Sequence, residues 1–135
     1  YKDAFIHITM ALAEDNSSPD FWLLSAKAAR GLGRPQDALA DIDTALLLAP
    51  GRRDLLANKT LWLYEAGRYE DSIRTAQKIL KQDPSNQLAL LVTAMDEYYL
   101  GRKKDSRRHM QAVLKGEPDT FAERVAEKLV QQLHF

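Results

Sequence analysis

The sequence contains no cysteine, which excludes disulfide bonds, thiolate nucleophiles and thiolate metal ligands. The absence leaves the compartment open, because cytosolic and exported proteins can both lack cysteine. The 135 residues are 45% hydrophobic and 28% charged, and the chain is long enough to bury a core without cross-links. These proportions are typical of one soluble globular domain.

The chain also lacks an excess of either charge and any long apolar run. Its 19 Lys and Arg balance 19 Asp and Glu, whereas proteins that bind nucleic acid usually carry a basic excess that neutralises phosphates. The longest apolar runs, such as LALLV at 88–92, are far too short to span a bilayer. We therefore expect no nucleic-acid partner and no transmembrane segment, and a soluble protein that is either cytoplasmic or exported.

Glycine and proline recur at one fixed interval. Three glycines follow one another 34 residues apart: Gly33, Gly67 and Gly101. Three prolines keep the same interval: Pro50, Pro84 and Pro118. Because two kinds of structure-breaking residue share one period through three cycles, we interpret the sequence as an internal repeat. Each interval between a glycine and a proline has room for one helix.

The segments from each glycine to the next proline carry an apolar stripe at helical spacing. The aligned stripes are Ala38, Ile42, Ala45 and Leu46, then Ser72, Ala76, Ile79 and Leu80, then Ser106, Met110, Val113 and Leu114. The first residue of each stripe is small, which allows the paired helix to approach closely. Start signals agree, since Ser18-Pro19 and Pro35 place proline in the first turn of a helix.

A 34-residue helix–turn–helix unit that ends in proline, with tryptophan early in its first helix, resembles the tetratricopeptide repeat. Trp22 stands at the tryptophan position, and Leu56 and Leu90 are its equivalents. The resemblance implies an all-α fold, a tetratricopeptide-repeat solenoid of antiparallel helix pairs in a right-handed superhelix. The array covers residues 1–118, with full repeats at 19–52, 53–86 and 87–118.

Both ends of the chain extend this pattern. Residues 1–16 match the second helix of a repeat whose first helix is absent, and the chain starts at Tyr1 rather than methionine, so we expect a piece of a longer array. No signal peptide is visible in the sequence. Residues 119–135 form an amphipathic pattern that begins with the capping box Thr120-x-x-Glu123. Solenoids need a terminal helix with a polar outer face, and we therefore predict a C-terminal capping helix.

One departure from the family pattern concerns a site that is normally packed. The family's first-helix tyrosine is replaced by Ala29, Leu63 and Glu97 in the three repeats. A carboxylate at such a site is costly unless it is hydrogen-bonded or solvated. We therefore expect Glu97 to have a basic partner or to lie at a solvent-exposed edge of the fold.

In the tetratricopeptide family the first helices line the concave side, which commonly holds a peptide or a partner's helix. The register carries ten residues to that side: Leu23, Lys27, Arg30, Asn58, Leu61, Tyr64, Leu88, Leu91, Met95 and Tyr98. The set is basic in the first repeat and mostly aliphatic or aromatic afterwards, which favours a largely apolar groove. The resemblance thus implies a protein–protein interaction module, such as an adaptor, a scaffold or a chaperone-like protein, that binds a partner peptide or helix.

Two alternatives remain open at this point. Apolar residues at helical spacing often belong to a core, and Leu88, Leu91 and Met95 would be covered if the C-terminal helix folded into the concave side. The half-repeat at the N-terminus leaves an apolar flank without its usual partner helix. That flank favours a structural element that oligomerises through its repeat ends, so a homo-oligomer is possible.

No motif indicates catalysis. The three histidines, His7, His109 and His134, are far apart and form no metal-ligand pattern, so we expect them on the solvated surface. The sequence has no phosphate-binding glycine loop and no nucleophile beside a base. We therefore expect no enzyme activity, no metal and no cofactor. The basic run RKKDSRRHM at 102–110 lies on a second helix and should face water.

Overall fold

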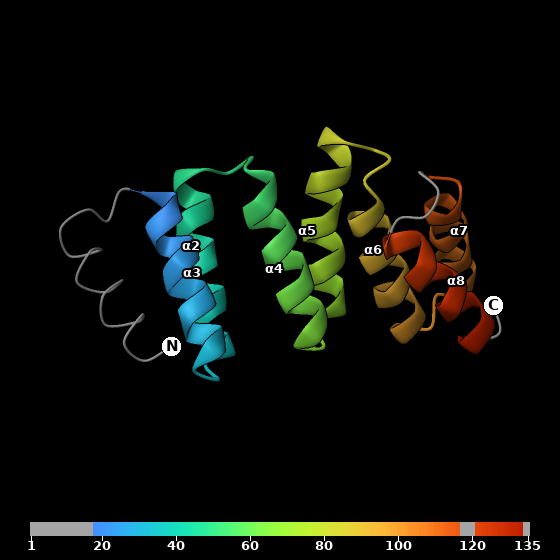
Figure 1. The fold of residues 1–135 in the computed structure, drawn as a ribbon, viewed down its shortest axis with the longest axis horizontal. Helices are drawn as coiled ribbons and strands as arrows, with labels where there is room; N and C mark the ends of the chain where they lie inside the picture. The colour runs from blue at the N-terminus through green and yellow to red at the C-terminus, as the bar shows by residue number, and fades with distance from the viewer. Residues whose placement is uncertain (1–17, 117–120, 134–135) are drawn as a thin grey trace. The chain divides into compact units, whose positions relative to one another are not determined.

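The computed structural model describes residues 18–116 and 121–133 of the chain, and these residues form seven helices and no strand (Figure 1). The helices in order are α2 (Pro19–Gly31), α3 (Pro35–Leu48), α4 (Arg53–Glu65), α5 (Tyr69–Gln82), α6 (Gln87–Tyr99), α7 (Lys103–Leu114) and α8 (Phe121–Leu133). The predicted all-α class is confirmed. The helix predicted at 1–16 lies outside the described residues.

The chain divides into two compact units, the first ending at Trp62 and the second beginning at Leu63. The division falls inside α4, so the first unit holds α2, α3 and most of α4, and the second holds the last turn of α4 and α5 to α8. Two helices lie in each of the ranges 19–52, 53–86 and 87–118. The division into repeats itself stays a prediction.

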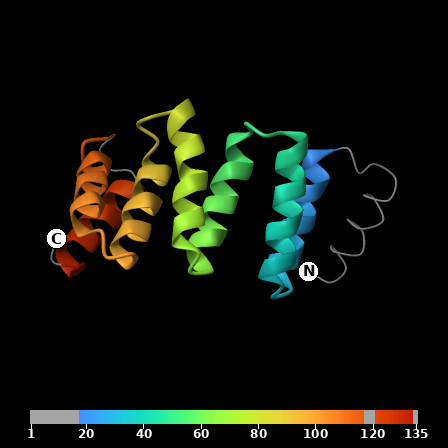
Figure 2. The ribbon, with the colours of Figure 1, turned by 180° about the vertical axis from the view of Figure 1, so that it is seen from behind.

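In the first unit, α2 and α3 pack side by side (Figures 1 and 2). Both helices have proline in their first turn, as expected, although the N-cap residue Ser18 makes no capping hydrogen bond through its side chain. Ion pairs tie α4 and the residue before it to this pair. Lys59 Nζ lies 2.7 Å from Asp43 Oδ1, and Arg52 lies 2.5 Å from Asp20 Oδ1.

The apolar stripe predicted for the second helices is buried in the same way in α3, α5 and α7. Its first three positions are buried in all three helices, and the fourth is partly buried. The first position is small because another helix passes directly over it. Ser106 in α7 shows this contact, since its hydroxyl donates a hydrogen bond of 2.6 Å to the carbonyl oxygen of Ala94 in α6.

The repeated glycines end the first helix of each pair. Gly33, Gly67 and Gly101 have φ angles of 75°, 74° and 82°, in the left-handed region that glycine enters without steric cost. The arginine after each glycine then donates its backbone N–H back across the turn, as in the 2.9 Å bond from Arg34 to the carbonyl oxygen of Ala29. This geometry explains why glycine recurs at this point of each repeat and why the residue after it is not proline.

In the second unit, α6 packs against α5 on one side and α7 on the other, and α8 packs against α6 and α7. One hydrophobic cluster joins the last three helices, with Leu91 from α6, Met110 from α7 and Ala126 from α8 among its buried members. Within the described part of the chain, no helix is both long and apolar enough to cross a membrane.

Candidate functional site

The ten residues predicted for the concave side are shared equally between the two units. Leu23, Lys27, Arg30, Asn58 and Leu61 lie on α2 and α4 of the first unit. Tyr64, Leu88, Leu91, Met95 and Tyr98 lie on α4 and α6 of the second unit. Each set is described below within its own unit.

Three of the predicted residues line one open hollow of about 350 Å³ in the first unit. Lys27 and Arg30 of α2 face Asn58 of α4 across it, and Gly31 and Trp62 complete its wall. The Arg30 guanidinium carbon lies 4.9 Å from the centre of the Trp62 ring, a cation–π contact that holds the guanidinium in place. Trp62 was not predicted, although it lies one helical turn after Asn58.

The hollow is basic because its lining contains Lys27 and Arg30 and no acidic residue, while three acids of this unit have basic partners. Arg52 pairs with both Asp20 and Asp54, and Lys59 pairs with Asp43. The Asn58 side-chain amide donates a hydrogen bond of 2.8 Å to the Asp54 carbonyl oxygen. Leu61 on α4 is half-buried and does not line the hollow, whereas Leu23 is buried and offers little area to a ligand.

In the second unit, Tyr64 and Tyr98 belong to a cluster of four tyrosines, here called the tyrosine cluster: Tyr64, Tyr69, Tyr98 and Tyr99. The Tyr69 and Tyr99 rings stack with their centres 5.1 Å apart, and Tyr64 is tilted against both, at 6.0 and 6.2 Å. Tyr98 meets Tyr99 edge to face at 5.6 Å. Tyr99 is 58% exposed, so the tyrosine cluster is accessible from solvent. Tyr69 and Tyr99 were not predicted.

Asp96 lies next to the tyrosine cluster and is completely buried. Neither of its carboxyl oxygens has a hydrogen-bond partner among the described residues. Burial raises the pKa of Asp96 to about 7, the nearby Ser72 hydroxyl lowers it in part, and the Glu97 carboxylate raises it further. Burial and the neighbouring Tyr99, Tyr69 and Asp96 likewise raise the pKa of the Tyr64 hydroxyl to about 12.

Glu97 has the basic partner that the sequence predicted. Its Oε1 lies 2.5 Å from Nδ1 of His109 on α7, and the Glu97 side chain is buried. The hydrogen bond to Glu97 raises the pKa of His109 above its ordinary value. The expectation of a solvated surface histidine is therefore wrong for His109, because its ring is needed to satisfy a buried carboxylate. His7 and His134 lie outside the described residues.

The C-terminal helix covers part of the predicted groove. Leu91 and Met95 of α6 belong to the same hydrophobic cluster as Val125, Ala126 and Val130 of α8. Leu91 is buried, so its side chain serves the core, as the first alternative anticipated for this helix. Leu88 and Met95 keep part of their surface exposed.

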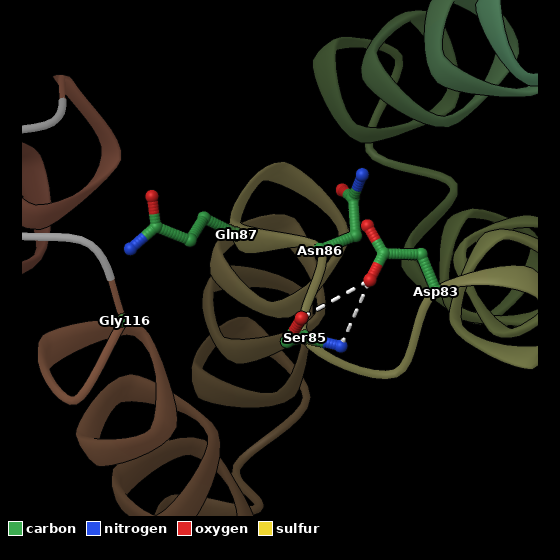
Figure 3. A pocket seen from close by; sticks show the side chains of 5 residues that line it. All are labelled: Asp83, Ser85, Asn86, Gln87 and Gly116. Carbon is green, nitrogen blue, oxygen red and sulfur yellow. Dashed lines mark hydrogen bonds between the residues drawn. The ribbon is translucent and has the colours of Figure 1, made fainter.

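A second hollow in this unit, of about 420 Å³, lies where α5 ends and α6 begins (Figure 3). Its polar groups are occupied by local structure. Asp83 accepts hydrogen bonds from the Ser85 backbone and hydroxyl, and Asn86 accepts one from the Ala89 backbone as the N-cap of α6. Gln87 donates to the Val113 carbonyl oxygen at 3.2 Å. The polar side chains that line this hollow therefore stabilise the ends of helices. Among them we find no group available for chemistry.

No group of three or more His, Asp or Glu residues within 18–116 and 121–133 is placed to hold a metal ion. The basic run on α7 does face water, as predicted, since Lys103, Lys104, Arg107 and Arg108 are all exposed.

Comparisons with solved structures show the same fold in proteins of low sequence identity. YrrB, described as a TPR protein with an unusual peptide-binding site, is 19% identical with a TM-score of 0.83, covering 96% of this chain and 66% of its own. MamA 41-end from Desulfovibrio magneticus RS-1 is 14% identical with a TM-score of 0.81, covering 98% and 83%. The first TPR of Spaghetti (RPAP3), bound to the HSP90 peptide SRMEEVD, is 15% identical with a TM-score of 0.73, covering 90% and 97%.

No curated protein matches the chain in sequence. A family model does, and it is described as tetratricopeptide repeat and matches residues 3–126. This family is generally a non-catalytic protein-interaction fold. Because the match spans most of the sequence and agrees with the helices, the chain belongs to the tetratricopeptide-repeat family.

Proposed function

We propose that this protein is a non-enzymatic module that binds a peptide or helix of a partner protein, in an adaptor, scaffold or chaperone-like role. The observation that carries the proposal is the open hollow in the first unit. Lys27, Arg30 and Asn58 were assigned to the concave side from the register alone, and they meet around one hollow with Trp62. Concave sites with a few polar groups beside an aromatic ring are typical of ligand binding.

The second unit supports the same proposal with a different surface. The tyrosine cluster and the half-exposed Leu88 and Met95 offer aromatic and aliphatic area. Tyrosine is among the residues that contribute most to binding energy at protein interfaces. Relatives agree with a peptide ligand, because YrrB is described by its peptide-binding site and the Spaghetti domain was solved with a peptide bound.

The proposal is tested with peptides selected from a random display library on the wild-type protein. We expect Leu61→Glu in the first unit or Tyr98→Ala in the second to weaken binding of such peptides by at least about 10-fold, or about 1.4 kcal/mol. The reason is that the first change buries a charge against the ligand and the second removes an aromatic contact. Affinities are measured by fluorescence anisotropy with labelled peptides.

Leu47→Glu is the matched control, because it makes the same substitution at a residue of α3 that is 82% exposed and is not among the ten predicted positions. Circular dichroism establishes that all three variants are folded. Selected peptides that bind the wild type, Leu61→Glu and Tyr98→Ala equally well would rule out both proposed surfaces.

A second candidate function, self-association, is favoured by exposed leucines in the first unit. Leu47 is 82% exposed, and Leu24 on α2 and Leu48 on α3 are also exposed. If these leucines form an interface, sedimentation velocity over a concentration series should show a dimer or larger species, and the double variant Leu47→Ser and Leu48→Ser should remain monomeric. A wild type that stays monomeric at the highest concentration would exclude this function for the chain.

A further inference from the structure

Asp96 differs from three other acids of the second unit. Those three have basic partners: Glu70 pairs with Arg102, Asp71 with Arg68 and Arg74, and Glu97 with His109. Asp96 alone of these four is fully buried, and neither of its oxygens has a hydrogen bond from the described residues. A buried carboxyl in that condition is costly unless a cation or a proton neutralises it.

The groups around Asp96 place its charge behind an aromatic surface. Tyr64 on α4 is close enough for Asp96 to raise the pKa of its hydroxyl, and Tyr64 contacts the rings of Tyr69 and Tyr99. On α5 the Ser72 hydroxyl is close enough to lower the pKa of Asp96 in part. The accessible part of this arrangement is Tyr99, which is 58% exposed.

We propose that the tyrosine cluster, with the Asp96 carboxyl behind it, binds an arginine side chain of a partner segment. The proposal rests on the peptide-binding function proposed above and specifies the chemistry of the ligand in the second unit. The faces of aromatic rings carry negative electrostatic potential that attracts cations. A guanidinium is planar and weakly hydrated, so it stacks on such rings at a lower desolvation cost than an ammonium.

The first unit already contains a contact between a guanidinium and an aromatic ring, because the Arg30 guanidinium lies 4.9 Å from the centre of the Trp62 ring. In the second unit, Arg102 and Arg68 are held by Glu70 and Asp71. An arginine from a partner, stacked on the tyrosine cluster, would place a cation near the Asp96 carboxyl, which has no basic partner among the described residues.

The arrangement makes arginine binding depend on pH in a defined direction. A cation near a carboxyl favours the ionised form of that carboxyl. The arginine ligand therefore binds better when Asp96 is charged. When Asp96 is neutral, binding of the ligand releases the proton of Asp96. Affinity should therefore increase as pH rises through the titration of Asp96. His109 on α7 also has a raised pKa because of its hydrogen bond to Glu97, so its contribution has to be separated by substitution.

The test is a titration with N-acetylarginine amide, followed through the backbone amide chemical shifts of Tyr98, Tyr99 and Leu100. The neutral isostere N-acetylcitrulline amide serves as the matched ligand. We expect the arginine probe to bind about 10-fold more tightly at about pH 8 than at about pH 6, because a pair of opposite charges is gained across a short distance of protein. The citrulline probe should bind weakly and equally at both values.

Three variants assign the effect to residues. Asp96→Asn should abolish the pH dependence and leave weak binding, Tyr99→Leu should weaken binding at both pH values, and His109→Gln should keep the pH dependence of the wild type. Arginine and citrulline probes that bind alike, or an Asp96→Asn variant that keeps the wild-type pH dependence, would overturn the proposal. The probe contains no partner sequence. A failed titration beside intact binding of selected peptides would thus reject the arginine site and leave the peptide-binding function standing.

Discussion

Asp96→Asn is expected to stabilise the second unit by about 2–4 kcal/mol at about pH 8 and to change its stability little at about pH 4. Asp96 is 0% exposed and its carboxyl oxygens have no hydrogen bond from the described residues. At high pH the folded protein must therefore hold a buried charge that no basic group among the described residues neutralises and that the Ser72 hydroxyl stabilises only in part. Asparagine has nearly the same shape as the protonated acid and never carries that charge.

The direction of the pH effect follows from the raised pKa of Asp96. Its pKa is about 7 in the folded protein, compared with an ordinary value of 3.8. The stability associated with the protonated carboxyl is therefore fully present below about pH 4 and is lost as the pH rises through about 7. Urea denaturation followed by circular dichroism, repeated across this range, should show a wild-type free energy of unfolding that falls more steeply than that of Asp96→Asn.

Two controls separate this effect from other titrations. Asp37→Asn makes the same change at an exposed position of the first unit and should keep the part of the slope that comes from Asp96. His109 acts in the same direction as Asp96, because Glu97 raises its pKa, so its contribution is present below about pH 6.5 and is lost as the pH passes the raised pKa. A smaller slope should therefore remain in Asp96→Asn and decrease further when His109→Gln is added. Curves of the wild type and Asp96→Asn that stay parallel would contradict the prediction.

The parts of the fold that were predictable are those set by local, periodic signals. Gly33, Gly67 and Gly101 could be placed at turns because only glycine enters the left-handed region there without cost. The apolar stripes of α3, α5 and α7 could be placed in the core because their spacing matches the helical period. Both inferences follow from local sequence and do not depend on which helices pack together.

The candidate site was only partly predictable, because helical periodicity does not distinguish a groove from a core. Lys27, Arg30 and Asn58 do meet around one hollow, but Leu91 from the same set is buried under α8. The tyrosine cluster also combines first-helix residues with Tyr69, which opens a second helix. A rule that considers first helices alone cannot find such a cluster.

Buried polar groups were the least predictable feature. Glu97 stood out because it replaces a tyrosine of the family pattern, and its need for a basic partner followed from its charge. The partner itself, His109, was assigned to the surface because its contact with Glu97 depends on how α6 and α7 pack. Asp96 gave no signal at all, since its burial results from the packing of other elements around it.

Leu56→Ala is expected to lower the free energy of unfolding of the first unit by about 3–4 kcal/mol, and Leu47→Ala by less than about 0.5 kcal/mol. Both changes replace a helical leucine with alanine in the first unit, so their effects on helix propensity are alike. They differ in burial, because Leu56 is 1% exposed and Leu47 is 82% exposed. Removing the Leu56 side chain leaves a cavity at the position where the repeat family places its tryptophan.

The measurement can be confined to the first unit, because both tryptophans of the chain, Trp22 and Trp62, belong to it. Their fluorescence during urea denaturation therefore reports the unfolding of that unit even where the second unit unfolds separately. A low protein concentration keeps any association through Leu47 out of the result. If the two alanine variants lose equal stability, the position of Leu56 in the core of the first unit, and the repeat register that aligns it with Trp22, would both be wrong.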